Sequence, residues 1–197
     1  MELKTDIMPK WQKRIKRGMD IMLSIVAIIL LSPFFLVIPI LIKRGSKGSV
    51  IFRQKRIGLH GNEFEILKFR TMKENSEADG PQLSSANDNR ITKVGKFIRR
   101  TSIDELPQFF NVLKGDMSFV GPRPERPEFV KDLNQQLPYY ESRHRVKPGL
   151  MGWAQLKFSY GASVEDAGNK LVYDLYYVKN YSLLLDILIV VQSVEII

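Results

Sequence analysis

A stretch of 22 residues without a charged side chain, from Ile21 to Ile42, constrains the fold of this 197-residue chain more than any other feature. As one helix it would be about 33 Å long, enough to cross the hydrocarbon core of a bilayer. Basic residues cluster before the run and after it: Lys10, Lys13, Arg14, Lys16 and Arg17 precede it, and Lys43, Arg44, Lys47, Arg53, Lys55 and Arg56 follow it. Positive charge favours the cytoplasmic side of a membrane, so both ends of the segment are predicted on that side.

Two membrane arrangements follow from this pattern. Ser32-Pro33 lies at the centre of the run, where proline removes a backbone donor and bends a helix. A re-entrant hairpin that enters, bends there and leaves by the same face satisfies both the proline and the basic flanks. An ordinary kinked transmembrane helix stays open, because such helices tolerate proline. A cleavable signal peptide is excluded by the length of the run, and a buried core helix is disfavoured for the same reason.

The net charge of +9 comes entirely from residues 1–60, which hold 12 basic and 3 acidic side chains, whereas residues 61–197 hold 18 of each. We expect the basic residues to contact anionic lipid headgroups rather than nucleic acid, because they flank an apolar run. The chain has no cysteine, which excludes disulfides and thiolate chemistry. Its two histidines disfavour a histidine-rich metal site. Carboxylates, lysines and arginines remain as its reactive groups.

The remainder predicts a predominantly helical α+β fold. We expect a basic interfacial lead-in and membrane hairpin over 1–45 and a cytoplasmic, membrane-associated catalytic domain over 46–197. A short β-hairpin is predicted from strands at 49–52 and 63–69. Helices are predicted over 92–100, 103–113, 127–137 and 163–180. The polar segment 74–90 is expected to be an exposed loop near the active site, with disorder as the alternative, and 182–197 an interfacial amphipathic helix or part of a longer one.

The densest polar cluster is the segment TSIDELPQ, residues 101–108. Ser102 followed by Glu105 fits a capping box, and Asp104 would favour the helix dipole, so a structural role is the first interpretation. Two adjacent carboxylates are not both needed as caps, however. Arginines precede them at 99 and 100, and Arg123 lies in a proline-stiffened turn, GPRP.

Carboxylates beside fixed arginines point to phosphate chemistry. An aspartate can attack phosphorus, Mg²⁺ takes carboxylate and phosphate oxygens, and arginine binds phosphate with two parallel hydrogen bonds. The chain has no Walker-type phosphate loop, so a nucleotide-hydrolysing motor is disfavoured.

Nine segments, in order along almost the whole chain, resemble the bacterial sugar transferase family, the monotopic phosphoglycosyl transferases that act on polyprenyl phosphate. The segments are RGMD (17–20), LSP (31–33), GSVIFRQ (48–54), KFRTM (68–72), TSIDELPQ (101–108), NVLKGDMS (111–118), VGPRP (120–124), KPGLMGWAQ (147–155) and DLYYV (174–178). The region 156–181 resembles the large members of the family, so we expect this chain to be the catalytic domain of such a protein.

The resemblance implies transfer of a sugar phosphate from a UDP-sugar to polyprenyl (undecaprenyl) phosphate, with release of UMP. This would be the first membrane step of exopolysaccharide, capsule or glycoconjugate assembly, at the cytoplasmic face of the bacterial inner membrane. The family also favours the monotopic hairpin, with its break at Ser32 and Pro33. It leaves a homodimer open, and the sequence does not identify the sugar.

By position, Asp104 would be the nucleophile that forms an aspartyl phosphosugar intermediate, and Glu105 would help to hold Mg²⁺. Arg123 would bind the diphosphate, with Lys68 and Arg99 as further phosphate ligands. Gln155 would also line the site. The alternative is a non-catalytic membrane anchor or assembly module of glycan machinery, in which the two carboxylates only cap a helix.

Overall fold

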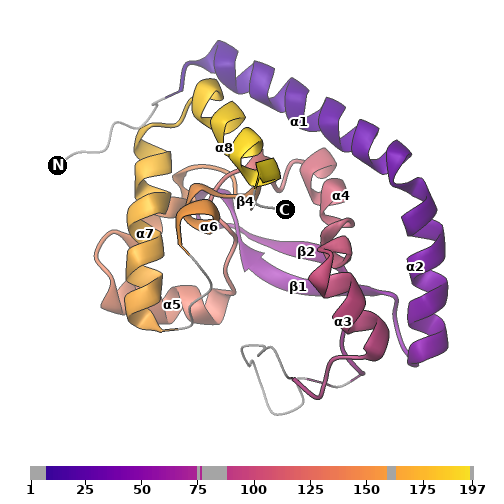
Figure 1. Cartoon of the computed structure of the whole chain (residues 1–197). Helices are drawn as coiled ribbons and strands as arrows, with labels where there is room; N and C mark the ends of the chain where they lie inside the picture. The colour runs from indigo at the N-terminus through magenta and orange to yellow at the C-terminus, as the bar shows by residue number, and fades with distance from the viewer. Residues whose placement is uncertain (1–7, 75, 77–87, 159–162, 196–197) are drawn as a thin grey trace.

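The computed structural model describes residues 8–74, 76, 88–158 and 163–195. The described chain is predominantly helical, with two small two-stranded sheets, as predicted for an α+β fold (Figure 1). Most of the predicted loop over 74–90 lies outside the described residues. The helices are α1 (Lys10–Leu30), α2 (Ser32–Gly45), α3 (Lys93–Arg100), α4 (Gln108–Lys114), α5 (Pro127–Gln136), α6 (Trp153–Lys157), α7 (Val164–Lys179) and α8 (Leu183–Glu195). The strands are β1 (Ile51–Ile57), β2 (Glu63–Phe69), β3 (Ser118–Val120) and β4 (Gly149–Met151), and the 3₁₀ turns are η1 (Leu59–Gly61), η2 (Ile103–Glu105) and η3 (Tyr140–Arg145).

The apolar run forms a bent pair of helices along one edge of the molecule (Figure 1). α1 and α2 meet at Leu31 at an angle of 61°. Pro33 lies in the first turn of α2, where its missing N–H group costs no helical hydrogen bond. Within the described residues, no single helix is long and apolar enough to cross a membrane. The two helices of the bent pair reach the required length and hydropathy only when they are taken together.

The outer face of this pair is not covered by the described part of the chain. Seven of its apolar side chains are more than half exposed: Trp11, Met22, Ile29, Leu30, Leu36, Val37 and Ile40. On the inner face, Ile38 and Ile42 pack with Phe69 of β2 and Ile98 of α3 in one core cluster. The hairpin is therefore joined to the globular part by α2 while most of its apolar surface stays accessible.

Lys16, which the sequence analysis assigned to the basic flank, instead points from α1 into the interior of the protein and is buried there. Its Nζ lies 2.6 Å from Asp186 Oδ2 of α8, and both side chains are less than a tenth exposed. It also donates to the carbonyl of Val120 in β3, and the Tyr177 hydroxyl lies 2.6 Å from the other Asp186 oxygen. The network fastens α1 to α8, which lies alongside it in Figure 1.

Arg17 also makes hydrogen bonds within the protein. It donates to the carbonyls of Val112 and Leu113 at 2.5 and 2.6 Å, in the last turn of α4, where the helix dipole favours a cation. Counting all five upstream cations as membrane flank is therefore wrong for Lys16 and Arg17. Among the described residues ahead of the apolar run, the exposed cations are Lys10, Lys13 and Arg14.

The β-hairpin is confirmed, but β1 is longer than predicted. Its antiparallel register runs from Ile51 opposite Phe69 to Ile57 opposite Glu63, so pairing continues to the tight turn. α4 docks on β2 through Asn111, whose amide donates to Glu65 O at 2.7 Å and accepts from Leu67 N at 2.9 Å. These contacts hold the segment that precedes α4 against β2.

Three predicted helices are confirmed as α3, α5 and α7. Ser163 and Asp166 form a capping box at the start of α7, and Gly115 ends α4 in the left-handed region at φ 100°. The continuous helix predicted over 103–113 is wrong. The chain forms η2 and begins again with α4 after Pro107, because proline lacks the N–H group that a continuous helix would need there. The parallel pair β3–β4 was not predicted, since three-residue strands carry no readable periodicity.

Candidate active site

A cleft of about 1620 Å³ opens between the β-hairpin, η2, the turn that follows β3, and helices α5 to α7. Its walls carry ten Lys or Arg side chains and six Asp or Glu side chains, so positive charge prevails. All six candidate site residues from the sequence line this one cleft: Lys68, Arg99, Asp104, Glu105, Arg123 and Gln155.

The segment that carries Asp104 and Glu105 is not a helix cap. Ser102 adopts a left-handed conformation at φ 53°, and its side chain makes no capping hydrogen bond. The Glu105 side chain bonds to other elements instead of returning to the backbone of Ser102. The capping-box interpretation is therefore wrong, and the non-catalytic alternative loses the role that it gave to the two carboxylates.

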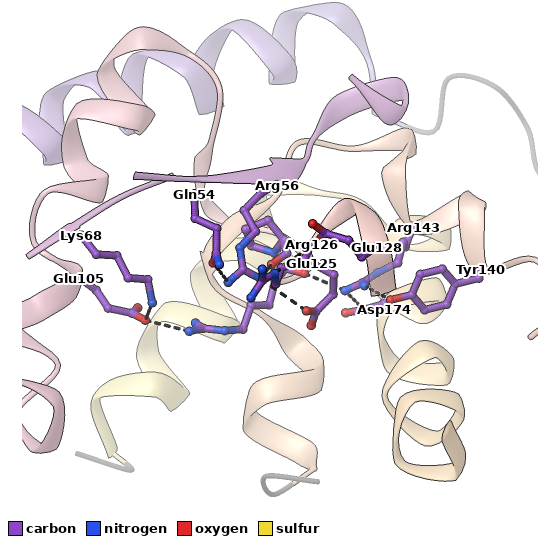
Figure 2. Close-up of polar contacts among 12 residues, drawn as sticks. Gln54, Arg56, Lys68, Glu105, Glu125, Arg126, Glu128, Tyr140, Arg143 and Asp174 are labelled. Carbon is purple, nitrogen blue, oxygen red and sulfur yellow. Dashed lines mark hydrogen bonds and ion pairs between the residues drawn. The ribbon is translucent and has the colours of Figure 1, made fainter. Parts of the chain in front are cut away.

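Glu105 is held by two cations that come from different parts of the chain. Lys68 Nζ of β2 and Arg123 Nη2 lie 2.7 and 2.8 Å from the same oxygen, Oε1 (Figure 2). Burial raises the pKa of Glu105, but Arg123 and Lys68 outweigh burial and lower it to about 2. Burial lowers the pKa of Lys68, and the Glu105 carboxylate opposes this. Glu105 is therefore ionised at neutral pH.

Asp104 occupies a different electrostatic environment although it is the adjacent residue. It is 8% exposed, and burial raises its pKa, against the opposing charges of Lys68 and Arg99. Among the described residues, no ion pair engages its carboxylate, because Lys68 and Arg123 both go to Glu105. The two carboxylates are thus perturbed in opposite directions, a pattern typical of groups with different chemical roles.

Arg99 and Gln155 lie on the walls of the cleft. Arg99 Nε donates to Thr71 Oγ1 at 2.8 Å, which ties α3 to the end of β2. α3 approaches this segment closely at Gly95, where a Cβ would lie 2.0 Å from the carbonyl oxygen of Thr71. Gln155 lies in α6, and a Cβ on Gly152 would come within 3.0 Å of its Oε1 and within 2.8 Å of the carbonyl oxygen of Gly121, so only glycine fits at position 152.

Several basic residues of the cleft were missed by sequence reasoning. Arg56 was counted as membrane flank, but it lines the cleft and donates to Gln54 Oε1 at 2.7 Å and to Pro124 O at 3.1 Å. Arg126 and Arg143 lie further along the same row (Figure 2). Strand alternation could have indicated that Arg56 shares a face with Gln54, whereas the other two carry no local signal.

The geometry of Glu105 is compatible with the magnesium ion that the resemblance implies. No group of three or more His, Cys, Asp or Glu that could hold a metal occurs among the described residues. Mg²⁺ usually takes only one or two carboxylates and completes its shell with water and substrate phosphate oxygens. Both cations donate to Oε1 of Glu105, so its Oε2 takes part in neither contact. Glu105 could therefore supply one ligand without a pre-built metal cage.

Comparison with known proteins decides the family. Residues 11–197 match the model of the bacterial sugar transferases. This chain belongs to the bacterial sugar transferase family. The match covers α1 from its second residue, all of α2 and every residue of the cleft named above.

Three relatives show what bacterial sugar transferases of this kind are named for. The chain is 51% identical over 181 residues to the UDP-N-acetylgalactosamine-undecaprenyl-phosphate N-acetylgalactosaminephosphotransferase of Aeromonas hydrophila, covering 92% of this chain and 43% of that protein. It is 40% identical over 192 residues to the undecaprenyl-phosphate glucose phosphotransferase of Komagataeibacter xylinus, covering 94% and 36%. It is 44% identical over 181 residues to the UDP-glucose:undecaprenyl-phosphate glucose-1-phosphate transferase of Klebsiella pneumoniae, covering 91% and 39%. The chain thus spans about two-fifths of the length of these relatives.

Proposed function

We propose that this chain is a phosphoglycosyl transferase that moves a sugar-1-phosphate from a UDP-sugar to undecaprenyl phosphate, with release of UMP. The observation that carries the proposal is the pair of the buried Asp104 and the partly buried Glu105 at the wall of a basic cleft, with Glu105 held by Lys68 and Arg123. Relatives of the chain are named for transfers of this kind to undecaprenyl phosphate. The two sugars in those names differ, so the donor sugar is left to experiment.

In the proposed reaction, Asp104 attacks the phosphorus that carries the sugar. The bond from this phosphorus to the bridging oxygen breaks, and UMP leaves with that oxygen. A phosphate oxygen of the polyprenyl phosphate then attacks the aspartyl phosphosugar, which gives polyprenyl diphosphate sugar and restores the Asp104 carboxylate. Asp104 suits the role because no cation among the described residues pairs with it.

Glu105 and the surrounding cations would bind and orient the diphosphate. Arg123 and Lys68 can shift from Glu105 toward phosphate oxygens and stabilise the charge that develops there. Glu105 would help to hold Mg²⁺, which when bound neutralises charge on the diphosphate. Arg99 lies close enough to Asp104 to lower its pKa and so to favour the ionised nucleophile.

We further propose that the bent pair α1–α2 is a re-entrant hairpin at the cytoplasmic face of the inner membrane. Its apolar outer face is exposed, and exposed cations remain at both ends: Lys10, Lys13 and Arg14 before it, and Lys43, Arg44 and Lys47 after it. Each cation near an anionic surface contributes about 1 kcal/mol of binding. This arrangement would place a site for a soluble donor beside a lipid acceptor.

The reaction is tested by UMP release from a panel of UDP-sugars with polyprenyl phosphate and Mg²⁺ in detergent. Asp104→Asn should abolish release, whereas the matched control Asp116→Asn, outside the cleft, should keep it. Without acceptor, intact-mass measurement should detect wild-type protein heavier by one sugar phosphate. Full activity in Asp104→Asn would end the nucleophile role, and release without the mass increase would exclude the covalent step.

The membrane arrangement is tested by single cysteines at Lys10 and Lys47, both exposed, in a chain with no cysteine of its own. In intact cells, a membrane-impermeant thiol reagent should fail to label either position, and both should react after the membrane is opened. Labelling of one position and not the other in intact cells would reject the hairpin.

A further inference from the structure

The turn that carries Arg123 is held by its carbonyl oxygens. Pro122 and Pro124 have no N–H group, so the turn has few backbone donors of its own. Its four successive carbonyls each accept a hydrogen bond from elsewhere: Pro122 from Gly149 N at 3.0 Å, Arg123 from Arg143 Nη2 at 2.8 Å, Pro124 from Arg56 Nη1 at 3.1 Å, and Glu125 from Ile57 N at 3.0 Å. Residues distant in the sequence therefore decide where Arg123 lies.

Arg143 is the donor to the carbonyl of Arg123 itself. Its side chain is 6% exposed, and Nη2 lies 2.7 Å from Oδ2 of Asp174, which is 5% exposed. Nη1 donates to the Tyr140 hydroxyl at 2.6 Å. One guanidinium thus joins η3, α7 and the turn, at the end of the row opposite Glu105 (Figure 2).

Stability alone does not account for this buried pair. An apolar pair of similar volume is often as stable as a buried ion pair. An apolar pair could not, however, donate to the Arg123 carbonyl. Burial lowers the pKa of Arg143, but the charge of Asp174 outweighs burial and raises it, so the Arg143 guanidinium stays charged.

We propose that Arg143, fixed by Asp174, is a positioning residue that directs Arg123 toward Glu105 and the donor diphosphate. This inference rests on the proposed function. Arg123 Nη2 lies 2.8 Å from Glu105 Oε1, so a shift of the turn by about 1 Å would break the contact. Misplacement of that size can cost about a hundredfold in rate.

The test begins with Arg143→Lys. Lysine keeps the positive charge opposite Asp174, but a single ammonium cannot reproduce the planar fork that also reaches Tyr140 and the Arg123 carbonyl. We expect kcat/KM for the UDP-sugar, per folded molecule, to fall between about tenfold and a hundredfold. The matched control is Asp186→Asn, which breaks the other buried ion pair, outside the cleft, and should leave kcat/KM of the folded fraction unchanged.

A double-mutant cycle separates positioning from a general structural effect. If Arg143 acts through Arg123, adding Arg143→Lys to Arg123→Lys should lower kcat/KM by less than about threefold. The proposal would be overturned if kcat/KM of the double variant fell by the product of the two single decreases. It would also be overturned if Arg143→Lys kept full kcat/KM. If Arg143→Lys does not fold, Asp174→Glu replaces it, because it keeps the charge and displaces the carboxylate, and the same criteria apply.

The wild type distinguishes this inference from the function on which it rests. If the wild type releases no UMP from any donor, the proposed function is refuted, and the role of Arg143 with it. If the wild type is active and the two substitutions act independently, only the positioning role is refuted.

Discussion

The buried pair between Lys16 and Asp186 allows a quantitative prediction about how the bent helices are joined to the globular part. Asp186→Asn leaves the Lys16 ammonium buried without a counterion, since both side chains are less than a tenth exposed. Loss of one partner of such a pair costs about 3–5 kcal/mol. For a chain of this size, about 2–4 °C of melting temperature is lost per kcal/mol, so the expected decrease is about 6–20 °C.

Thermal unfolding in detergent at neutral pH, followed by tryptophan fluorescence, measures this decrease. The control is Glu65→Gln, which breaks the exposed pair with Arg53, 3.4 Å apart, and should cost less than about 1 kcal/mol. The double variant Lys16→Met/Asp186→Leu should recover most of the stability, because both charges of the pair are removed together and the Tyr177 hydroxyl keeps its bond to Val120 O. Equal midpoints for Asp186→Asn and Glu65→Gln would refute the reasoning, as would a double variant no more stable than Asp186→Asn.

Two further predictions concern the cleft. Gly95→Ala would place a Cβ 2.0 Å from the Thr71 carbonyl oxygen, so it should lower the free energy of unfolding measured in urea by about 1–3 kcal/mol. The control Gly18→Ala, whose Cβ would have no atom within 4 Å, should leave that free energy unchanged or raise it, and equal effects of the two substitutions would contradict the close approach. The pKa of Glu105 is about 2 in the folded protein, against an ordinary value of 4.5. Its ionised form therefore adds about 3 kcal/mol to the free energy of unfolding above pH 4.5, and this contribution is lost as the pH falls toward 2. The stability difference between wild type and Glu105→Gln should shrink by that amount between pH 5 and 2, and a constant difference would show that Glu105 is not held by its cations.

The candidate site was predictable from sequence to the extent that its residues lie in recognisable segments. Asp104, Glu105, Lys68, Arg99 and Arg123 were each identified there, and the structure brings all of them to one cleft. The capping box at residues 102–105 was the misleading signal. The same four-residue spacing forms a true box at Ser163–Asp166, where a long helix follows. At Ser102 the following chain is interrupted by Pro107, and cations from β2 and the GPRP turn compete for Glu105.

The sequence by itself determined the features that depend on neighbouring residues. The uncharged run, the proline at its centre, the β-hairpin and the caps at Gly115 and Ser163 are local, because a few adjacent residues set their backbone conformation and hydrogen bonding.

Only the tertiary structure decided which cations stay exposed, which line the cleft and which are buried in the interior. Lys16 meets Asp186 across 170 positions, Arg17 meets Val112 across 95, and Arg56 meets Pro124 across 68. A lysine or arginine looks the same in sequence whether its partner is a headgroup, a carbonyl or a carboxylate. That choice depends on which distant group packing brings within hydrogen-bond distance, because burial of a charge is tolerated only where such a partner is present.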